Sequence, residues 1–194
     1  MNLKKNLPSL ILSITEKVKN NYHFFNVYFQ DETRLGLFTL NGKALTARGV
    51  KPICNFQHKF ENTYLFGAYS PINGASLTLQ LPNCDTENFQ IFLTELAAQS
   101  PKEYKILILD NGSFHKAKRL IVPENICLLF LPPYSPELNP AEKIWAKIKR
   151  QLKLKHFKTL IDLIDCVCDK VKNELTMLEI LSITRFGYYA NLFG

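Results

Sequence analysis

Residues 131–153 read LPPYSPELNPAEKIWAKIKRQLK, a proline-rich approach followed by a strongly patterned helix. Asn139 can cap the helix through its side-chain oxygen, and Pro140 suits the first helical position because its missing N–H would have no partner there. Apolar residues then recur at helical spacing and predict a stripe that faces a core: Ile144, Trp145, Ile148 and Leu152. The segment therefore predicts an amphipathic helix that packs on a larger domain.

A carboxylate and two lysines share the neighbouring face of this helix. Glu142 falls at the third helical position, and Lys149 and Lys153 follow it after about two and three turns. Seven of the 24 Lys and Arg residues lie between Lys143 and Lys158 with no acid among them, a charge equal to the chain's net +7. A solvated basic face and a simple Asn-x-x-Glu capping box would explain these features. The sharper interpretation is a phosphate-contacting surface beside a metal-binding carboxylate.

Two more carboxylates follow strand-like segments. Residues 105–109, KILIL, form an apolar run that leads to Asp110, which predicts a buried central strand covered on both faces. Residues 24–30, FFNVYFQ, form an aromatic strand pattern that leads to Asp31, with Glu32 immediately behind it. Either Asp alone could be an ordinary residue at the end of a strand, but the combination with Glu142 suggests one acidic site.

Three sequence blocks carry a resemblance to a known family. They are FQDETRLGL (29–37), ILDNGSFHKAK (108–118) and LPPYSPELNPAEKIWAKIK (131–149). These blocks resemble the signature motifs of the DDE transposases, in particular the bacterial insertion-sequence branch of the mariner-like superfamily. The resemblance extends over roughly residues 22–155, and its third block is highly specific.

The resemblance implies a ribonuclease-H-like fold and a catalytic, metal-binding triad of Asp31, Asp110 and Glu142. The 31 residues between Asp110 and Glu142 are slightly fewer than the family pattern implies, so we expect a shortened helix after Asp110. The family block also carries a His where His115 stands. His115 could contact a DNA phosphate or orient a carboxylate, although a surface or helix-capping role is equally compatible with the sequence.

The periodicity of the chain predicts the same architecture. The expected elements are a helix within residues 1–20, strands at 24–30 and 35–40, a hairpin at 63–81, a helix at 85–99, a strand at 105–110, a short helix at 116–120, a strand at 126–131 and the helix that follows Asn139. We therefore expect an α/β fold, a ribonuclease-H-like mixed five-stranded sheet flanked by helices.

The C-terminal third adds a closing helix and a tail. Thr159 with Asp162 predicts a capping box, and an apolar stripe follows: Ile161, Ile164, Cys168, Val171 and Leu175. We divide the chain into a helical lead-in (1–20), a catalytic domain (21–176) and a tail (177–194). The tail contains four aromatic residues and is expected to pack on the core or on a second subunit.

Other residues are assigned supporting roles. Basic side chains expected to hold DNA phosphates, together with His115, are Lys116, Lys118, Arg119, Lys149 and Lys153. Asn111 and Asn139 are expected to shape the site rather than bind metal. Trp145 is assigned to the core, and Glu32 is taken as a neighbour of Asp31.

The residue types define the expected chemistry. Three carboxylates are all oxygen donors, which suit Mg²⁺ or Mn²⁺ better than zinc. Two such ions roughly 3.5–4 Å apart can activate a water or a 3′-hydroxyl and stabilise the leaving oxygen of a phosphodiester. Five cysteines without a C-x-x-C pair argue against zinc and disulfides and fit a reducing cytosol. No stretch predicts a membrane span, so we expect a soluble, cytoplasmic, nucleoid-associated protein with no membrane partner.

The expected function is that of a transposase catalytic domain that cuts DNA at element ends and joins it to target DNA, as a homodimer. The resemblance also implies a helix-turn-helix recognition region, which an upstream reading frame would supply or from which this chain is separated as a fragment. One alternative is a catalytically idle remnant that binds DNA or a full-length transposase and inhibits it. Another is a structure-specific nuclease of the same fold.

Overall fold

A five-stranded mixed sheet forms the centre of the structure, a computed structural model that describes residues 3–22, 24–38, 47–51, 57, 59–133 and 135–185. The strands are β1 (Phe24–Gly36), β2 (Asn62–Tyr69), β3 (Ser76–Leu81), β4 (Glu103–Leu109) and β5 (Ile126–Phe130). Their spatial order is β3-β2-β1-β4-β5. The pairs β1–β2 and β2–β3 are antiparallel, whereas β1–β4 and β4–β5 are parallel. The predicted mixed sheet is confirmed.

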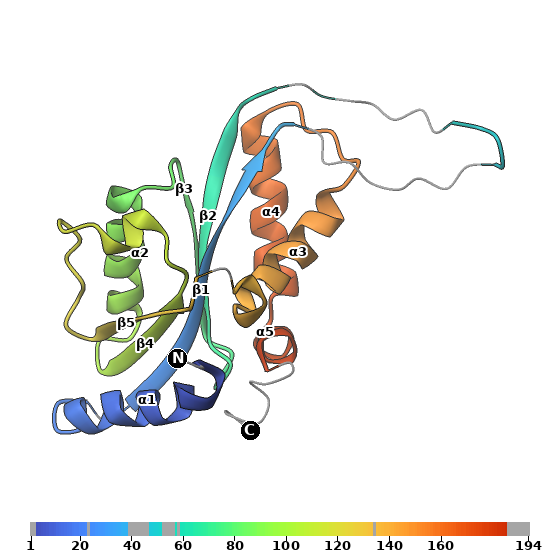
Figure 1. Cartoon of the computed structure of the whole chain (residues 1–194). Coiled ribbons are helices and arrows are strands. Elements are labelled where there is room, and N and C mark those ends of the chain that lie inside the picture. The colour runs from blue at the N-terminus through green and yellow to red at the C-terminus, as the bar shows by residue number, and fades with distance from the viewer. Residues whose placement is uncertain are drawn as a thin grey trace.

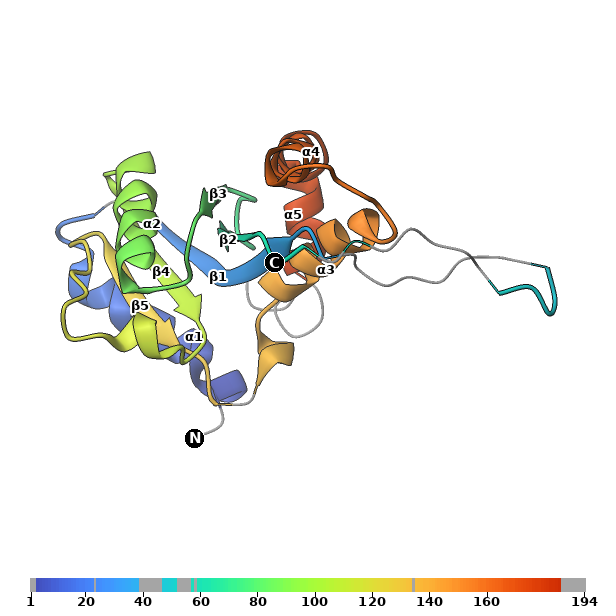
Figure 2. The same ribbon diagram turned by 90° about the horizontal axis from the view of Figure 1, so that it is seen from above.

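Helices cover both faces of this sheet (Figures 1 and 2). On one face lie α3 (Ala141–Leu152), α4 (Leu160–Glu174) and α5 (Met177–Thr184), and on the other lies α2 (Thr86–Gln99). The N-terminal helix α1 (Leu3–Val18) adds Leu7 to the core on the α3 side. There is a hydrophobic core on each face of the sheet, and side chains of β1 alternate between them. Val27 and Phe29 face the α3 side, while Tyr28 faces α2.

The strand that carries Asp31 differs from its prediction. Residues 24–30 and the start of 35–40 belong to one strand of 13 residues, and Asp31 lies within it. Pairing with β2 continues without a break from Phe29 opposite Tyr69 to Gly36 opposite Asn62, so the chain does not turn at Asp31. The separate strand predicted at 35–40 is therefore wrong for Leu35 and Gly36, and residues 39–40 lie outside the described residues.

The helix predicted at 116–120 is also corrected. A single 3₁₀ turn, η1, spans Ser113–Lys116, and Ala117 is already extended. The helical turn is four residues long and comes earlier in the chain than predicted. The shift places His115 inside the turn, where it is buried.

Two predicted apolar stripes are confirmed and the third is confirmed only in its C-terminal part. The stripe of α3 is buried, and on α2 the buried residues include Phe89, Phe92, Leu93 and Leu96. On α4 the Thr159 capping box forms, and at the end of the stripe Val171 packs against the core and Leu175 is buried. At its start, however, Ile161 and Cys168 are exposed, and Leu163 and Val167 are buried instead. Residues 160–168 read LIDLIDCVC, so two faces are apolar and periodicity cannot choose between them. Packing against the neighbouring helices decides.

The tail begins with a helix and joins the core. In α5, Ile180 and Thr184 are buried, and Arg185 donates to the carbonyl oxygens of Pro71 and Ile72, both at 2.6 Å. The aromatic residues of the tail lie outside the described residues. None of the helices in the described part of the chain combines the length and apolar composition needed to cross a bilayer.

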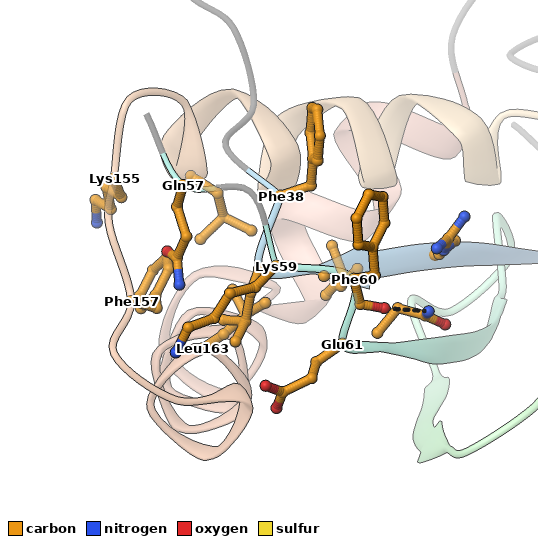
Figure 3. Close-up of a pocket in the computed structure, with 14 residues that line it drawn as sticks. Phe38, Gln57, Lys59, Phe60, Glu61, Lys155, Phe157 and Leu163 are labelled. Carbon is orange, nitrogen blue, oxygen red and sulfur yellow. Dashed lines mark hydrogen bonds between the residues drawn. The ribbon is translucent and has the colours of Figure 1, made fainter. Parts of the chain in front are cut away.

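A hollow of about 310 Å³ opens where the end of β1 meets α4 (Figure 3). Leu35, Leu152 and Leu163 contribute apolar surface, and Lys59 and Lys155 contribute positive charge. Among the described lining residues, Glu61 is the one carboxylate, so this hollow is not the predicted acidic site.

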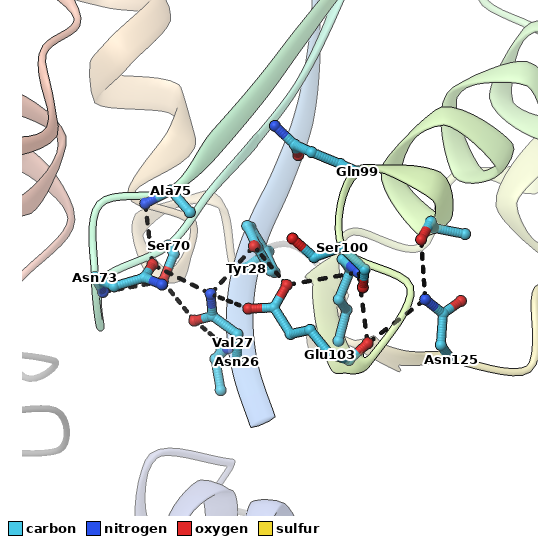
Figure 4. Close-up of polar contacts among 12 residues, drawn as sticks. Asn26, Val27, Tyr28, Ser70, Asn73, Ala75, Gln99, Ser100, Glu103 and Asn125 are labelled. Carbon is cyan, nitrogen blue, oxygen red and sulfur yellow. Dashed lines mark hydrogen bonds and ion pairs between the residues drawn. The ribbon is translucent and has the colours of Figure 1, made fainter. Parts of the chain in front are cut away.

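A buried polar network joins β1 to β4 at the opposite end of the sheet (Figure 4). Asn26 donates to Glu103 Oε1 at 2.8 Å, and the Tyr28 hydroxyl donates to Glu103 Oε2 at 3.1 Å. Lys105 is fully buried, with Nζ 2.7 Å from the Ser100 carbonyl oxygen and 3.5 Å from Glu103 Oε2. Burial lowers the pKa of Lys105, and the charge of Glu103 opposes that shift. Glu103 therefore compensates the buried cation.

Replacing Glu103 by Ala should remove the acceptor shared by Asn26, Tyr28 and Lys105. Because a buried charge then loses its partner, we expect the free energy of unfolding to fall by about 3 kcal/mol. Urea denaturation followed by circular dichroism measures the change. Glu16→Ala is the control, because its ion pair with Lys19 is exposed and contributes less than about 1 kcal/mol. A similarly small loss for Glu103→Ala would contradict a stabilising network.

Candidate active site

Parallel pairing of β1 with β4 brings the two predicted aspartates together. Phe29 lies opposite Ile108 in the register, and Asp31 and Asp110 each follow two residues later. Glu142 lies in the first turn of α3. All three line one cavity of about 450 Å³, together with Asn111, Gly112, Leu131, Pro132, Pro133, Ser135 and Asn139. The three acids predicted from sequence therefore converge on one site.

Asn139 holds the start of α3 against β1. Its Nδ2 donates to the carbonyl oxygen of Gln30 at 2.7 Å, and its Oδ1 accepts from the N–H of Ala141 at 3.1 Å. The helix begins at Ala141 with Pro140 in the cap position, so Asn139 is not the cap residue and Glu142 is the second helical residue. Asn139 shapes the site by tying α3 to the residue that precedes Asp31.

Gly67 lets α3 approach the sheet beside the same aspartate. Gly67 is the partner of Asp31 in the β1–β2 register. A Cβ atom at Gly67 would lie 2.7 Å from Cζ2 of Trp145 and 2.5 Å from the Tyr69 hydroxyl oxygen. Trp145 is buried and packs edge-on against Tyr69, with ring centroids 5.6 Å apart. The close contact of Trp145 with β2 thus requires glycine and keeps Glu142 near Asp31.

The three carboxylates differ in their electrostatic setting. Burial, together with the charges of Glu32, Glu142 and Asp110, raises the pKa of Asp31 to about 8. Burial and then Asp110 raise the pKa of Glu142. In contrast, the contact with His115 is the main cause that lowers the pKa of Asp110. Negative charge therefore accumulates around Asp31, which a bound cation would relieve.

His115 is buried at 2% exposure between two carboxylates. Its Nε2 forms a hydrogen bond of 3.0 Å with Glu32 Oε1, and its Nδ1 lies 3.0 Å from Asp110 Oδ1. Burial opposes a charge on the imidazole, but the two carboxylates outweigh it and raise the pKa of His115 to about 9. The prediction that His115 contacts a DNA phosphate directly is wrong, because the side chain is enclosed. The alternative prediction, orientation of a carboxylate, agrees with the geometry.

Glu32 is the residue whose role the sequence did not reveal. Successive strand residues point to opposite faces, so Glu32 points away from Asp31 and toward α2. There it meets His115, and Gln30 Nε2 donates to the same oxygen, Glu32 Oε1, at 2.6 Å. The parity of the strand predicts the opposite direction of the two side chains, but contact with His115 depends on where η1 lies.

The donor set fits a hard divalent cation. Asp31, Asp110 and Glu142 offer carboxylate oxygens, and Asn111 and Asn139 also line the cavity. Within the described ranges, no three His, Cys, Asp or Glu side chains are close enough to form a ready metal cluster. Glu142 is exposed on the first turn of a helix, where its long side chain has room to move. The residues therefore offer the oxygen donors that Mg²⁺ or Mn²⁺ prefers, but their side chains are farther apart than in a formed metal site.

The predicted phosphate-binding residues lie in different settings. Lys116 donates to Asn111 Oδ1 and lies 4.7 Å from the centre of the Phe130 ring. Arg119 pairs with Glu87 at 2.7 Å on the surface, and Lys118 and Lys153 are exposed. Lys149 is half-buried, and burial lowers its pKa while the charge of Asp31 opposes that shift. Asn111 donates to the Leu131 carbonyl oxygen and so joins the ends of β4 and β5.

The matches to known proteins agree with this site. The chain belongs to the DDE superfamily endonuclease family, whose model matches residues 26–164. The protein named uncharacterized protein y4pE/y4sA of Sinorhizobium fredii is 41% identical over 107 residues, which are 54% of this chain and 79% of that protein. The family predicted from the three sequence blocks is thus confirmed.

Solved structures with the same fold are complexes of the Mos1 transposase. The Mos1 strand transfer complex matches with a TM-score of 0.65 at 16% identity, over 98% of this chain and 61% of that one. The Mos1 mariner paired end complex with Mn matches with a TM-score of 0.64 at 16% identity, over 98% and 60%. This likeness shows a ribonuclease-H-like fold. The chain spans about three fifths of the length of these transposase chains.

Without a cation, stability should depend on the proton of Asp31. The folded-state pKa of about 8 lies above the ordinary value of 3.8, so the folded protein holds a proton that the unfolded chain releases. The stability from this group is complete below about pH 4 and is lost as the pH rises to about 8. In chelator-treated buffer, the stability of Asp31→Asn relative to wild type should therefore grow across this window, by about 1–3 kcal/mol at pH 7.

Urea denaturation at pH 4, 6 and 8 measures this difference. The matched control is Asp169→Asn on α4, which is exposed and should differ from wild type by the same amount at each pH. A constant difference for Asp31→Asn across the three values would contradict a raised pKa for Asp31.

Proposed function

We propose that this chain is the catalytic domain of a DNA transposase that depends on a divalent metal. It hydrolyses phosphodiester bonds at the ends of a mobile element and joins the freed 3′-hydroxyl to target DNA. The observation that carries the proposal is the convergence of Asp31, Asp110 and Glu142, from β1, β4 and α3, on one cavity. Membership of the DDE superfamily endonuclease family supports phosphodiester chemistry at that cavity.

Asp31, Asp110 and Glu142 would hold Mg²⁺ or Mn²⁺. Bound as a pair, such ions activate the attacking water or 3′-hydroxyl and stabilise the departing oxygen. Asp31 is fixed by strand pairing and Asp110 by its contacts with Gly112 and His115, whereas Glu142 approaches from the helix. The Mos1 mariner paired end complexes named with Mn and with Mg support this choice of ions.

DNA is the proposed substrate because the chain is basic and two of its lysines lie close to site residues, Lys116 bonded to Asn111 and Lys149 near Asp31. The net charge is +7 and the isoelectric point is about 9.1. Lys149 and Lys153 extend from the cavity along α3, and Lys116, Lys118 and Arg119 follow Asp110. These five side chains would bind phosphates and position the scissile bond over the carboxylates.

The assembly proposed for the reaction is a homodimer that pairs two DNA ends. The paired-end arrangement named for Mos1 supports it. A helix-turn-helix recognition region, encoded upstream or in a longer form of the chain, would supply sequence specificity. The division into residues 1–20, 21–176 and 177–194 and a cytoplasmic, nucleoid-associated location belong to the same proposal. An idle, inhibitory remnant is the alternative that the activity assay must exclude.

Divalent cations should stabilise the folded protein. Because a cation relieves the repulsion around Asp31, Mn²⁺ at about 100 times its dissociation constant should add about 2.7 kcal/mol to the free energy of unfolding. Differential scanning calorimetry with and without Mn²⁺ measures the effect. Asp31→Asn should lose most of it, whereas Asp169→Asn should respond as the wild type does. An unchanged melting temperature for the wild type would count against the metal site.

Cleavage and strand transfer test the reaction itself. The assay uses DNA that carries the terminal repeats flanking the gene, with Mn²⁺ or Mg²⁺. Glu142→Gln should lower product formation by about 100-fold or more, because the proposed site loses one of the three carboxylates that would hold the ion, and the ion would stabilise the charge that develops on the phosphate. Glu124→Gln, an exposed acid before β5, is the matched control and should keep wild-type activity. Bound DNA without products from the wild type would point to a missing recognition region or to the inhibitory remnant.

A further inference from the structure

Glu32 and His115 form a chain of contacts that ends at Asp110. Glu32 from β1 contacts His115 from η1, and His115 contacts Asp110 at the end of β4. We propose that the Glu32–His115 pair positions Asp110 for cation binding, and that neither residue touches the metal or the DNA. This inference rests on the proposed metal-dependent function, and it assigns the site two positioning residues beyond the triad.

Glu32 and His115 are both held in place. The exposed fraction of the side chain is 1% for His115 and 9% for Glu32. Glu32 Oε1 accepts from Gln30 Nε2 at 2.6 Å and faces His115 Nε2 at 3.0 Å. The imidazole also contacts two aromatic rings, Phe89 at 4.4 Å and Phe114 at 4.1 Å between centroids. A ring held on both edges and by two aromatic neighbours has little freedom to rotate.

One carboxylate oxygen of Asp110, Oδ1, makes the contacts with its neighbours. Oδ1 accepts from the N–H of Gly112 at 2.8 Å and lies 3.0 Å from His115 Nδ1. The contact with His115 has the distance of an ion pair without the alignment of a good hydrogen bond. Among the described residues, no hydrogen bond is recorded for Oδ2, while Asp110 lines the cavity. The two contacts therefore fix the carboxylate and leave its second oxygen available to a cation.

The backbone at Gly112 leaves room for this contact. A Cβ atom at position 112 would lie 3.0 Å from His115 Nδ1 and 3.2 Å from Asp110 Oδ1. Glycine at this position thus lets the imidazole and the carboxylate approach the turn closely. Residues that contact a metal ligand from behind orient it, and their loss typically weakens metal binding by about 10- to 100-fold.

Positioning and charge predict opposite effects for the loss of His115. A positively charged imidazole near the cavity would repel a divalent cation, so by charge alone His115→Ala should tighten Mn²⁺ binding. Positioning predicts weaker binding, because Asp110 loses its orientation. At Glu32 the substitution that distinguishes positioning from charge is Gln. It removes the charge but keeps an oxygen that can accept from His115 Nε2.

The experiment is calorimetric titration of the metal-free protein with Mn²⁺. We expect His115→Ala and Glu32→Ala each to raise the dissociation constant by about 10- to 100-fold, and Glu32→Gln to remain within about threefold of the wild type. The double variant Glu32→Ala with His115→Ala should bind no more weakly than His115→Ala, because Glu32 acts through His115. His156→Ala, an exposed His beyond α3, is the matched control. Tighter binding by His115→Ala, or additive losses in the double variant, would overturn the proposal.

A measurement on metal-free protein separates this inference from the proposed function. Side-chain ¹⁵N NMR should show a shift of the His115 Nε2 signal in Glu32→Ala and of the Nδ1 signal in Asp110→Asn, with both variants folded by circular dichroism. If the wild type binds no Mn²⁺, the proposed function fails, and the NMR signals still decide whether Glu32, His115 and Asp110 are in contact. Unchanged His115 signals in both variants would overturn the positioning role even if Mn²⁺ binds.

Discussion

Parallel pairing between β1 and β4 is the constraint on which the rest of the structure depends. It places Asp31 and Asp110 at the same level on neighbouring strands, two residues beyond the Phe29–Ile108 pair. Both strands lie inside the sheet, with β2 beyond β1 and β5 beyond β4, so neither can slide without breaking two ladders. A slip of one residue would also reverse every side chain, because strand residues alternate between faces. The relative position of the two aspartates is therefore set by the whole sheet.

Acids that lie close together repel one another when ionised. Their surroundings shift the pKa values of the two aspartates in opposite directions. Asp31 lies deep beside α3, where burial and neighbouring acids favour its protonated form. Asp110 lies at the strand end, where Gly112 and His115 favour its ionised form. The two aspartates therefore favour different protonation states, although they are the same residue type. Glu142, exposed on α3, is the least constrained of the three.

The helix that carries Glu142 is placed by contacts of residues before and after Glu142 in the sequence. Asn139 ties its start to the carbonyl oxygen of Gln30, and Trp145 packs where Gly67 leaves room. These contacts involve residues that are distant in sequence, 109 positions apart for Asn139 and Gln30. A local motif can specify the helix and its cap region, but its position on the sheet depends on what β1 and β2 present.

By itself, the sequence determined the family and the order of the elements and predicted the three acids that line one cavity, because these depend on local motifs and on the period of apolar residues. The stripe of α3 and the buried run before Asp110 belong to this group. Tertiary structure alone decided the continuity of β1 through Asp31, the buried face of α4 and the enclosure of His115. Strand continuity depends on pairing with β2, and α4 has two apolar faces from which packing selects one. His115 is buried because η1, Glu32 and α2 meet there, and no local pattern records that three distant segments converge.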